Sequence, residues 1–200
     1  YAVEAVNPLA VRATEHLEAL RRAVCEGMLS LEKLGLNTGT SGNLSVRTDD
    51  GFLITPSGFK PVAITPEKVV QLDSLTVQNE QRIKPSSEWR FHKDIYAARM
   101  DINAVVHVHS TNATALACQR RSIPPFHYMV AVAGGNSIRC APYAAFGTPT
   151  LSDGILRSLD DRRACLMANH GMVALGESIE VAIDLAVEVE ELARQYAHAR

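Results

Sequence analysis

The stretch Ala104-Val105-Val106-His107-Val108-His109 decides how this sequence is interpreted. Its β-branched residues predict a buried strand. Side chains alternate along a strand, so His107 and His109 are predicted to project to one face while Val106 and Val108 project to the other. Two imidazoles buried without partners would be costly to desolvate, and a shared divalent metal ion would remove that cost. Many His-x-His pairs on protein surfaces bind nothing, so the pair does not by itself establish a metal site.

A third histidine lies in Asn169-His170-Gly171, at the end of another apolar stretch. Catalytic zinc is typically bound by three protein ligands, with one position left open. His107, His109 and His170 would supply such a set. The alternative is that His170 only caps a turn, and the spacing leaves both interpretations open. Four further histidines have no comparable local context: His16, His92, His127 and His198.

The segments on both sides of this strand predict an α/β domain. Long helices are expected where apolar residues recur at helical spacing, over 8–34, 87–100 and 178–200. Short helices are expected to begin at Thr65 and Thr111. Strands are predicted over 44–47, 52–55, 104–109, 164–168 and 172–175. Because hairpins favour antiparallel pairing, we expect a central mixed, mainly antiparallel sheet flanked by helices, in a single domain over residues 1–200.

Composition excludes several classes of protein. Hydrophobic residues make up 46% and charged residues 21% of 200 residues, as in ordinary globular proteins. The formal charge of −2 and the lack of a basic segment argue against a nucleic-acid partner, and no apolar run is long enough for a membrane span. The four cysteines are far apart and include no Cys-x-x-Cys pair, so we expect buried, reduced cysteines and a cytoplasmic location.

Polar loops near the predicted helix over 87–100 offer sites for an anion. Ser86 and Ser87 precede this helix, and hydroxyl and N–H groups at a helix N-terminus can bind an anion, although both serines are also ordinary caps. Glu88 is expected in the first turn, where the helix dipole alone would explain a carboxylate. Residues 39–43 and 55–58 add further backbone donors. Neither loop matches a nucleotide-triphosphate motif, and such a cluster suits a single phosphate.

Taken together and in this order, these segments resemble the class II aldolase/adducin family. Seven segments carry the resemblance: Thr40-Ser41-Gly42-Asn43-Leu44-Ser45, Ile54-Thr55-Pro56-Ser57-Gly58, Pro85-Ser86-Ser87-Glu88, His107-Val108-His109, residues 127–138, Ala141-Pro142-Tyr143 and Asn169-His170-Gly171. The resemblance spans about residues 12–197. Seven ordered segments are far more specific than any single motif, and they favour the three-histidine metal site over a turn-capping role for His170.

The resemblance implies a zinc-dependent lyase that cleaves a ketose 1-phosphate reversibly to dihydroxyacetone phosphate and an aldehyde. The implied ligands of one zinc ion per subunit, or of another divalent metal, are His107, His109 and His170. Glu88 is the implied acidic partner that ligates the metal without substrate and serves as the base. The positions that hold the substrate phosphate correspond to Gly42, Asn43, Ser57, Gly58, Ser86 and Ser87.

The resemblance also implies a homotetramer with active sites between subunits. Tyr128 matches a tyrosine that reaches the neighbouring subunit's site and exchanges a proton there, and Phe146 matches an aromatic residue that lines the aldehyde pocket. The alternative for Tyr128 is an ordinary core position. Chains of the family continue into a C-terminal tail that helps to cover the site, whereas this sequence stops at Arg200, so we expect that tail to be absent or trimmed here.

Other activities of the family remain alternatives. Its 4-epimerases characteristically have Asp at the position of Glu88, which argues against that branch. Methylthioribulose-phosphate dehydratases and sugar-acid-phosphate decarboxylases share the metal scaffold and are the next candidates. An adducin-like interaction module without catalysis would require a degraded metal site, whereas all three histidines and Glu88 are present.

Overall fold

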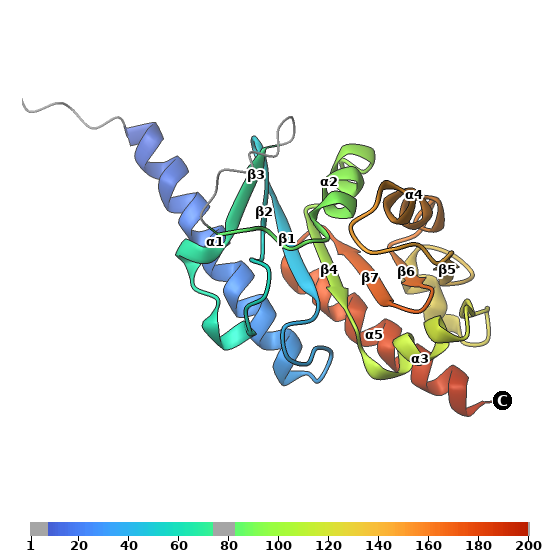
Figure 1. Cartoon of the computed structure of the whole chain (residues 1–200). Helices are drawn as coiled ribbons and strands as arrows, with labels where there is room; N and C mark the ends of the chain where they lie inside the picture. The colour runs from blue at the N-terminus through green and yellow to red at the C-terminus, as the bar shows by residue number, and fades with distance from the viewer. Residues whose placement is uncertain (1–7, 74–82, 200) are drawn as a thin grey trace, which may run out of the picture.

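One mixed sheet of seven strands forms the centre of the computed structural model, which describes residues 8–73 and 83–199 (Figure 1). The strand order is β3-β2-β1-β4-β7-β6-β5, and every pair is antiparallel except β5 with β6. The strands are β1 (Asn43–Thr48), β2 (Gly51–Ile54), β3 (Val70–Asp73), β4 (Ala104–Val108), β5 (Arg139–Ala141), β6 (Ala164–Met167) and β7 (Gly171–Gly176). The predicted mixed, mainly antiparallel sheet is confirmed.

Helices cover both faces of this sheet (Figure 1). The α-helices within the described residues are α1 (Pro8–Lys33), α2 (Trp89–Ala98), α3 (Thr111–Cys118), α4 (Pro149–Ser158) and α5 (Ile179–His198). One apolar core joins α1, α3 and α5 to one face of the sheet, and a second core joins α2 and α4 to the opposite face. None of the helices in the described ranges has the length and apolar character of a membrane span.

Most predicted elements are present, with small differences at their ends. The long terminal helix begins after Ser178, whose hydroxyl accepts a hydrogen bond from the Val181 N–H, as its N-cap position predicts. The helix expected from residue 87 begins at Trp89. The short helix expected at Thr65 is a single 3-10 turn over Pro66–Lys68. Prediction missed β3, β5 and α4, two of which are strands of only three or four residues.

The four cysteines are all free, as expected, but they are not all buried. Cys25 and Cys165 lie in the core and Cys140 is half-buried. Cys118 is exposed at the last residue of α3, so the prediction of a buried side chain is wrong there. The apolar neighbours of Cys118 in the sequence belong to the buried face of that helix, whereas its last turn points Cys118 outward.

Strand β4 lies at the middle of the sheet and is completely buried. Val106 and Val108 belong to the core beneath α1 and α5, whereas Val105 belongs to the core beneath α2 and α4. The Phe91 ring, on the α2 side, meets the His107 ring edge-on at 5.7 Å between centroids. The predicted alternation therefore holds, and it directs the His107 side chain toward α2.

Candidate active site

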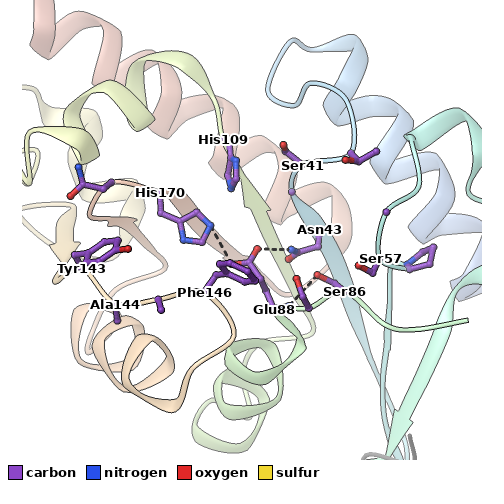
Figure 2. A pocket seen from close by; sticks show the side chains of 17 residues that line it. Ser41, Asn43, Ser57, Ser86, Glu88, His109, Tyr143, Ala144, Phe146 and His170 are labelled. Atoms are coloured by element: carbon purple, nitrogen blue, oxygen red, sulfur yellow. Dashed lines mark hydrogen bonds and ion pairs between the residues drawn. The ribbon is translucent and has the colours of Figure 1, made fainter. Parts of the chain in front are cut away.

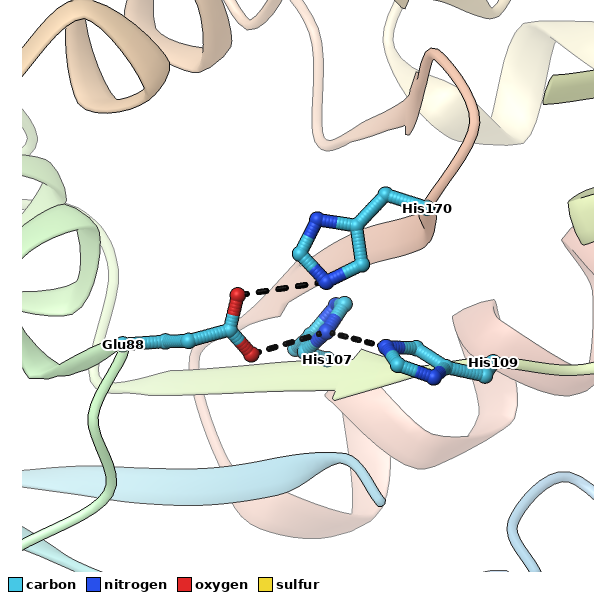
Figure 3. A group of neighbouring side chains, drawn as sticks. All are labelled: Glu88, His107, His109 and His170. Carbon is cyan, nitrogen blue, oxygen red and sulfur yellow. Dashed lines mark hydrogen bonds and ion pairs between the residues drawn. The ribbon is translucent and has the colours of Figure 1, made fainter. Parts of the chain in front are cut away.

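Four titratable side chains converge at one end of β4 (Figure 3). One potential ligand atom from each of Glu88, His107, His109 and His170 lies within 4.8 Å of all the others. The Nε2 atoms of His107 and His109 are 3.0 Å apart. The two carboxylate oxygens of Glu88 lie 3.1 Å from His107 Nε2 and 3.2 Å from His170 Nε2. The structure thus brings together the four residues that were predicted from the sequence to form the metal site.

Each of these side chains comes from a different local structure. His107 is on β4, and His109 follows one residue after the strand ends at Val108, so the predicted strand is one residue too long. His170 lies in the tight turn that joins β6 to β7. Glu88 is the N-cap residue of α2 and not a first-turn residue as predicted, and its side chain makes no capping hydrogen bond. Its carboxylate is therefore free to face the imidazoles.

The hydrogen bonds around His107 prepare its ring for a metal ion. Its Nδ1 atom lies 2.8 Å from the carbonyl oxygen of Met172 and donates to it, because a carbonyl oxygen can only accept. This bond directs Nε2, with its lone pair available for a metal, toward His109 and Glu88. Three imidazole nitrogens and one carboxylate are a donor set that zinc and other divalent transition metals accept. The residues present therefore fit a divalent cation.

The electrostatics of the cluster agree with this donor set. Burial, together with the neighbouring His107, lowers the pKa of both His109 and His170 to about 4, so these imidazoles are neutral near pH 7, as metal ligands must be. Burial would raise the pKa of Glu88, but His107, His170 and Asn43 outweigh burial and hold that pKa well below its usual value. For His107 burial opposes the charge, yet Glu88 raises its pKa overall, so a metal ion bound at Nε2 would take the place of a proton there.

A pocket of about 460 Å³ opens beside the cluster (Figure 2). Glu88, His109 and His170 form part of its wall. All six residues that the resemblance assigned to the substrate phosphate also line it: Gly42, Asn43, Ser57, Gly58, Ser86 and Ser87. Phe146, assigned to the aldehyde end, lines it as well and is 68% exposed. Six segments far apart in the sequence therefore meet at one cavity.

Backbone hydrogen bonds hold two of the pocket loops together. The Ser57 N–H donates to the Lys84 carbonyl at 3.0 Å, and the Ser86 N–H donates to the Thr55 carbonyl at 2.9 Å. Among the described residues that line the pocket there is no Lys or Arg. Hydroxyl and amide groups, rather than basic side chains, are thus the donors that this wall offers to an anion.

Tyr128 lies away from this pocket in the same chain. It is absent from the described residues that line the cavity, and it is 82% exposed at the start of a 3-10 helix over Tyr128–Ala133. The interpretation of Tyr128 as an ordinary core residue is therefore wrong. Two residues near the site had no role assigned from the sequence: the pocket-lining Tyr143, which only belonged to a matching segment, and the buried His92, which bonds to Asn43. The signal for His92 was its position four residues after Glu88, one helical turn away.

This chain is similar to known proteins in family, sequence and structure. Residues 22–197 match the family model described as Class II Aldolase and Adducin N-terminal domain. The chain is 54% identical over 178 residues to a Rhodospirillum rubrum protein named 5-methylthioribulose-1-phosphate/5-deoxyribulose-1-phosphate aldolase, covering 89% of this chain and 80% of that protein. It is 48% identical over 177 residues to the L-fuculose phosphate aldolase of Escherichia coli, covering 88% of this chain and 82% of that protein.

The solved structures agree with the sequence relatives. A structure named L-fuculose 1-phosphate aldolase superposes with a TM-score of 0.87 at 38% identity, covering 90% of this chain and 86% of that chain. A putative aldolase/epimerase/decarboxylase from Escherichia coli superposes with a TM-score of 0.81 at 32% identity, covering 90% of this chain and 88% of that chain. The expectation of a lyase is confirmed by the aldolase names of the relatives. The family model covers most of the chain, and on this ground the chain belongs to the class II aldolase and adducin family.

Proposed function

We propose that this protein is a metal-dependent aldolase that cleaves a ketose 1-phosphate reversibly to dihydroxyacetone phosphate and an aldehyde. The observation that carries the proposal is the convergence of Glu88, His107, His109 and His170 at the wall of a pocket lined by serine and glycine loops. The names of the relatives support it, since they act on 5-methylthioribulose 1-phosphate, 5-deoxyribulose 1-phosphate and L-fuculose phosphate. All of these are sugar phosphates of one chemical class.

In this proposal the three histidines hold the metal through their Nε2 atoms, and Glu88 is the fourth ligand in the resting site. A bound divalent cation, zinc in the first instance, supplies Lewis-acid polarisation of the substrate carbonyl. His107 keeps its orientation through the Met172 carbonyl. Because the imidazoles of His109 and His170 are neutral near pH 7, no proton has to leave these two rings before they can bind the ion.

Glu88 is proposed as the base that moves a proton at the carbon next to the substrate carbonyl. In the direction of aldol addition it removes that proton, and in cleavage it returns it. Its low pKa keeps the carboxylate ionised at neutral pH, so it can accept a proton. The Asn43 amide donates to its Oε2 atom at 3.1 Å, which fixes the carboxylate between the imidazoles and the pocket.

The serine and glycine loops are proposed to hold the phosphate, at the end of the substrate that does not react. The six residues assigned to it are Gly42, Asn43, Ser57, Gly58, Ser86 and Ser87. Binding this end positions the reacting carbon near Glu88 and lowers the entropic part of the barrier. Phe146 then faces the aldehyde portion, where its exposed ring offers an apolar contact.

Tyr128 is proposed to serve the site of a neighbouring subunit in a cytoplasmic homotetramer. Its 82% exposure and its absence from the pocket of its own chain support a role toward a partner. In that site its hydroxyl would exchange a proton with the oxygen of the aldehyde. The four free cysteines support a reducing compartment.

The experiment that tests the function follows dihydroxyacetone phosphate release from a panel of ketose 1-phosphates. Zinc-loaded protein is given L-fuculose, 5-deoxyribulose and 5-methylthioribulose 1-phosphates, with chelator-treated protein as the control. We expect equimolar dihydroxyacetone phosphate and aldehyde from at least one substrate, and loss of both products after metal removal. Dehydration or epimerisation of these substrates without dihydroxyacetone phosphate would contradict the proposal and favour another branch of the family.

A further inference from the structure

Two rows of polar side chains face each other beneath the candidate metal centre, one on β1 and one on α2. Alternate residues of a strand lie on one face about 6.6 Å apart, and residues four apart on a helix lie on one face about 6 Å apart. Because these spacings are nearly equal, successive side chains of one row lie opposite successive side chains of the other. The β1 row is Asn43, Ser45 and Arg47, and the row on α2 and its cap is Glu88, His92 and Tyr96.

The hydrogen bonds between the rows form one continuous chain that begins at Glu88. Asn43 Nδ2 lies 3.1 Å from Glu88 Oε2, and a carboxylate without a proton can only accept, so the amide NH2 group faces it. The amide oxygen Oδ1 then faces His92 Nε2 at 2.5 Å. Since an amide oxygen also only accepts, His92 must carry its proton on Nε2.

The far side of the His92 ring completes the chain. Burial lowers the pKa of His92 to about 3, so the ring is neutral, with a lone pair on Nδ1. Ser45 Oγ lies 2.6 Å from Nδ1 and donates to it. The Tyr96 hydroxyl lies 2.8 Å from Ser45 Oγ. Because Ser45 already donates its only hydroxyl proton to His92, Tyr96 is the donor in this second bond. Every donor in the chain therefore points toward Glu88.

We propose that His92 is a positioning residue that fixes the amide of Asn43 and, through it, the carboxylate of Glu88. The reversed Asn43 amide would place its oxygen against the Glu88 carboxylate and its NH2 group against the His92 N–H, and both contacts are repulsive. His92 and Ser45 are fully buried and Asn43 is 2% exposed, so water does not compete for these bonds. One N–H of His92 therefore excludes the wrong amide orientation. The catalytic part of this inference rests on the proposed function.

A plain packing role makes a different prediction. His92 also stacks on Phe91 with centroids 4.4 Å apart, so its ring could simply fill the core. In that case any side chain of similar size and shape would serve equally well. Gln and Met are both unbranched and similar in size to each other. Only Gln offers an N–H to Asn43 and an oxygen to Ser45 in place of the imidazole nitrogens.

The test compares His92→Gln with His92→Met in the zinc-loaded protein. We expect His92→Met to lower kcat about ten- to a hundredfold with little change in KM, as for other residues that support metal ligands. We expect His92→Gln to recover most of that loss. Zinc content and thermal unfolding are measured on both variants. Equal kcat losses in two variants of matched stability and zinc content would overturn the positioning role.

A spectroscopic measurement tests the inference independently of activity. Nitrogen-15 NMR of the wild-type, zinc-loaded protein, with labelled histidine, reports which ring nitrogen of His92 bears the proton. We expect the Nε2–H tautomer, with a proton protected from exchange with water. A proton on Nδ1 would overturn the proposed direction of the chain. If no substrate is cleaved, the proposed function fails, and this measurement still decides the arrangement around His92 and Asn43.

Discussion

Gly42 and Gly39 lie in the same loop, and replacing each with Ala separates two costs to stability. One is the strain of a left-handed backbone, and the other is steric overlap with a neighbouring side chain. Both glycines have a left-handed backbone, with φ of 73° and 70°. A left-handed conformation costs about 1–2 kcal/mol for a residue with a Cβ atom. A Cβ at Gly39 meets nothing within 4 Å, whereas a Cβ at Gly42 lies 2.7 Å from the Cγ of Asn37. Asn37 is only 5% exposed, so its side chain has little room to move.

Gly39→Ala is therefore expected to lower the free energy of unfolding by about 1–2 kcal/mol, the backbone cost alone. Gly42→Ala adds an overpacking cost of about 1–3 kcal/mol on top of the same backbone cost. Urea unfolding followed by circular dichroism, at one fixed protein concentration, measures both. Gly42→Ala should also raise KM, because Gly42 lines the pocket and Gly39 does not. Equal unfolding free energies for the two variants would refute the argument from Asn37.

Three further predictions address the site. Glu88→Gln should slow proton exchange at the carbon next to the carbonyl about 10²- to 10⁴-fold while zinc binding persists, and exchange at the wild-type rate would assign the base elsewhere. Mixing Glu88→Gln with Tyr128→Phe subunits should restore about one quarter of wild-type activity, because a random assembly pairs an intact Glu88 with a neighbour's intact Tyr128 at that frequency; mixed oligomers as inactive as their parents would contradict the proposed role of Tyr128. Metal-free protein should lose stability as the pH falls below 6.5, because His92 stays neutral when folded, with a pKa of about 3, but takes up a proton when unfolded. At pH 5, protonation of His92 in the unfolded chain lowers the free energy of unfolding by about 2 kcal/mol. His92→Gln should therefore reduce the pH dependence of urea unfolding in this range, and an unchanged pH dependence would exclude His92 as its source.

Local patterns predicted the parts of the fold that local interactions determine. The alternation of residues 104–108 indicated a central strand with His107 on one face, and the structure places Val106 and Val108 on the other. Apolar spacing predicted the two long helices, α1 and α5. Strands β3 and β5 were missed because three or four residues carry too little periodicity to indicate a strand on their own.

The site depends on contacts between distant segments, which local patterns do not specify. Glu88 could be explained from the sequence by the helix dipole, and only the packing of α2 across β1 and β4 turns its carboxylate toward His107. The spacing of His92 from Glu88 indicates only a shared helix face, whereas that same packing joins His92 to Asn43. The order of the seven matching segments pointed to a shared site before any geometry was known. That order reflects the fold of a whole family rather than the propensity of any one segment.

The central claim is that Glu88 and the three histidines form a metal site, and anomalous X-ray diffraction tests it most directly. Crystals grown with one equivalent of zinc per chain are measured at energies just above and below the zinc absorption edge. We predict one anomalous peak per chain, about 2.0–2.1 Å from the Nε2 atoms of His107, His109 and His170. A zinc peak at another position, or none within this cluster at full loading, would contradict the account.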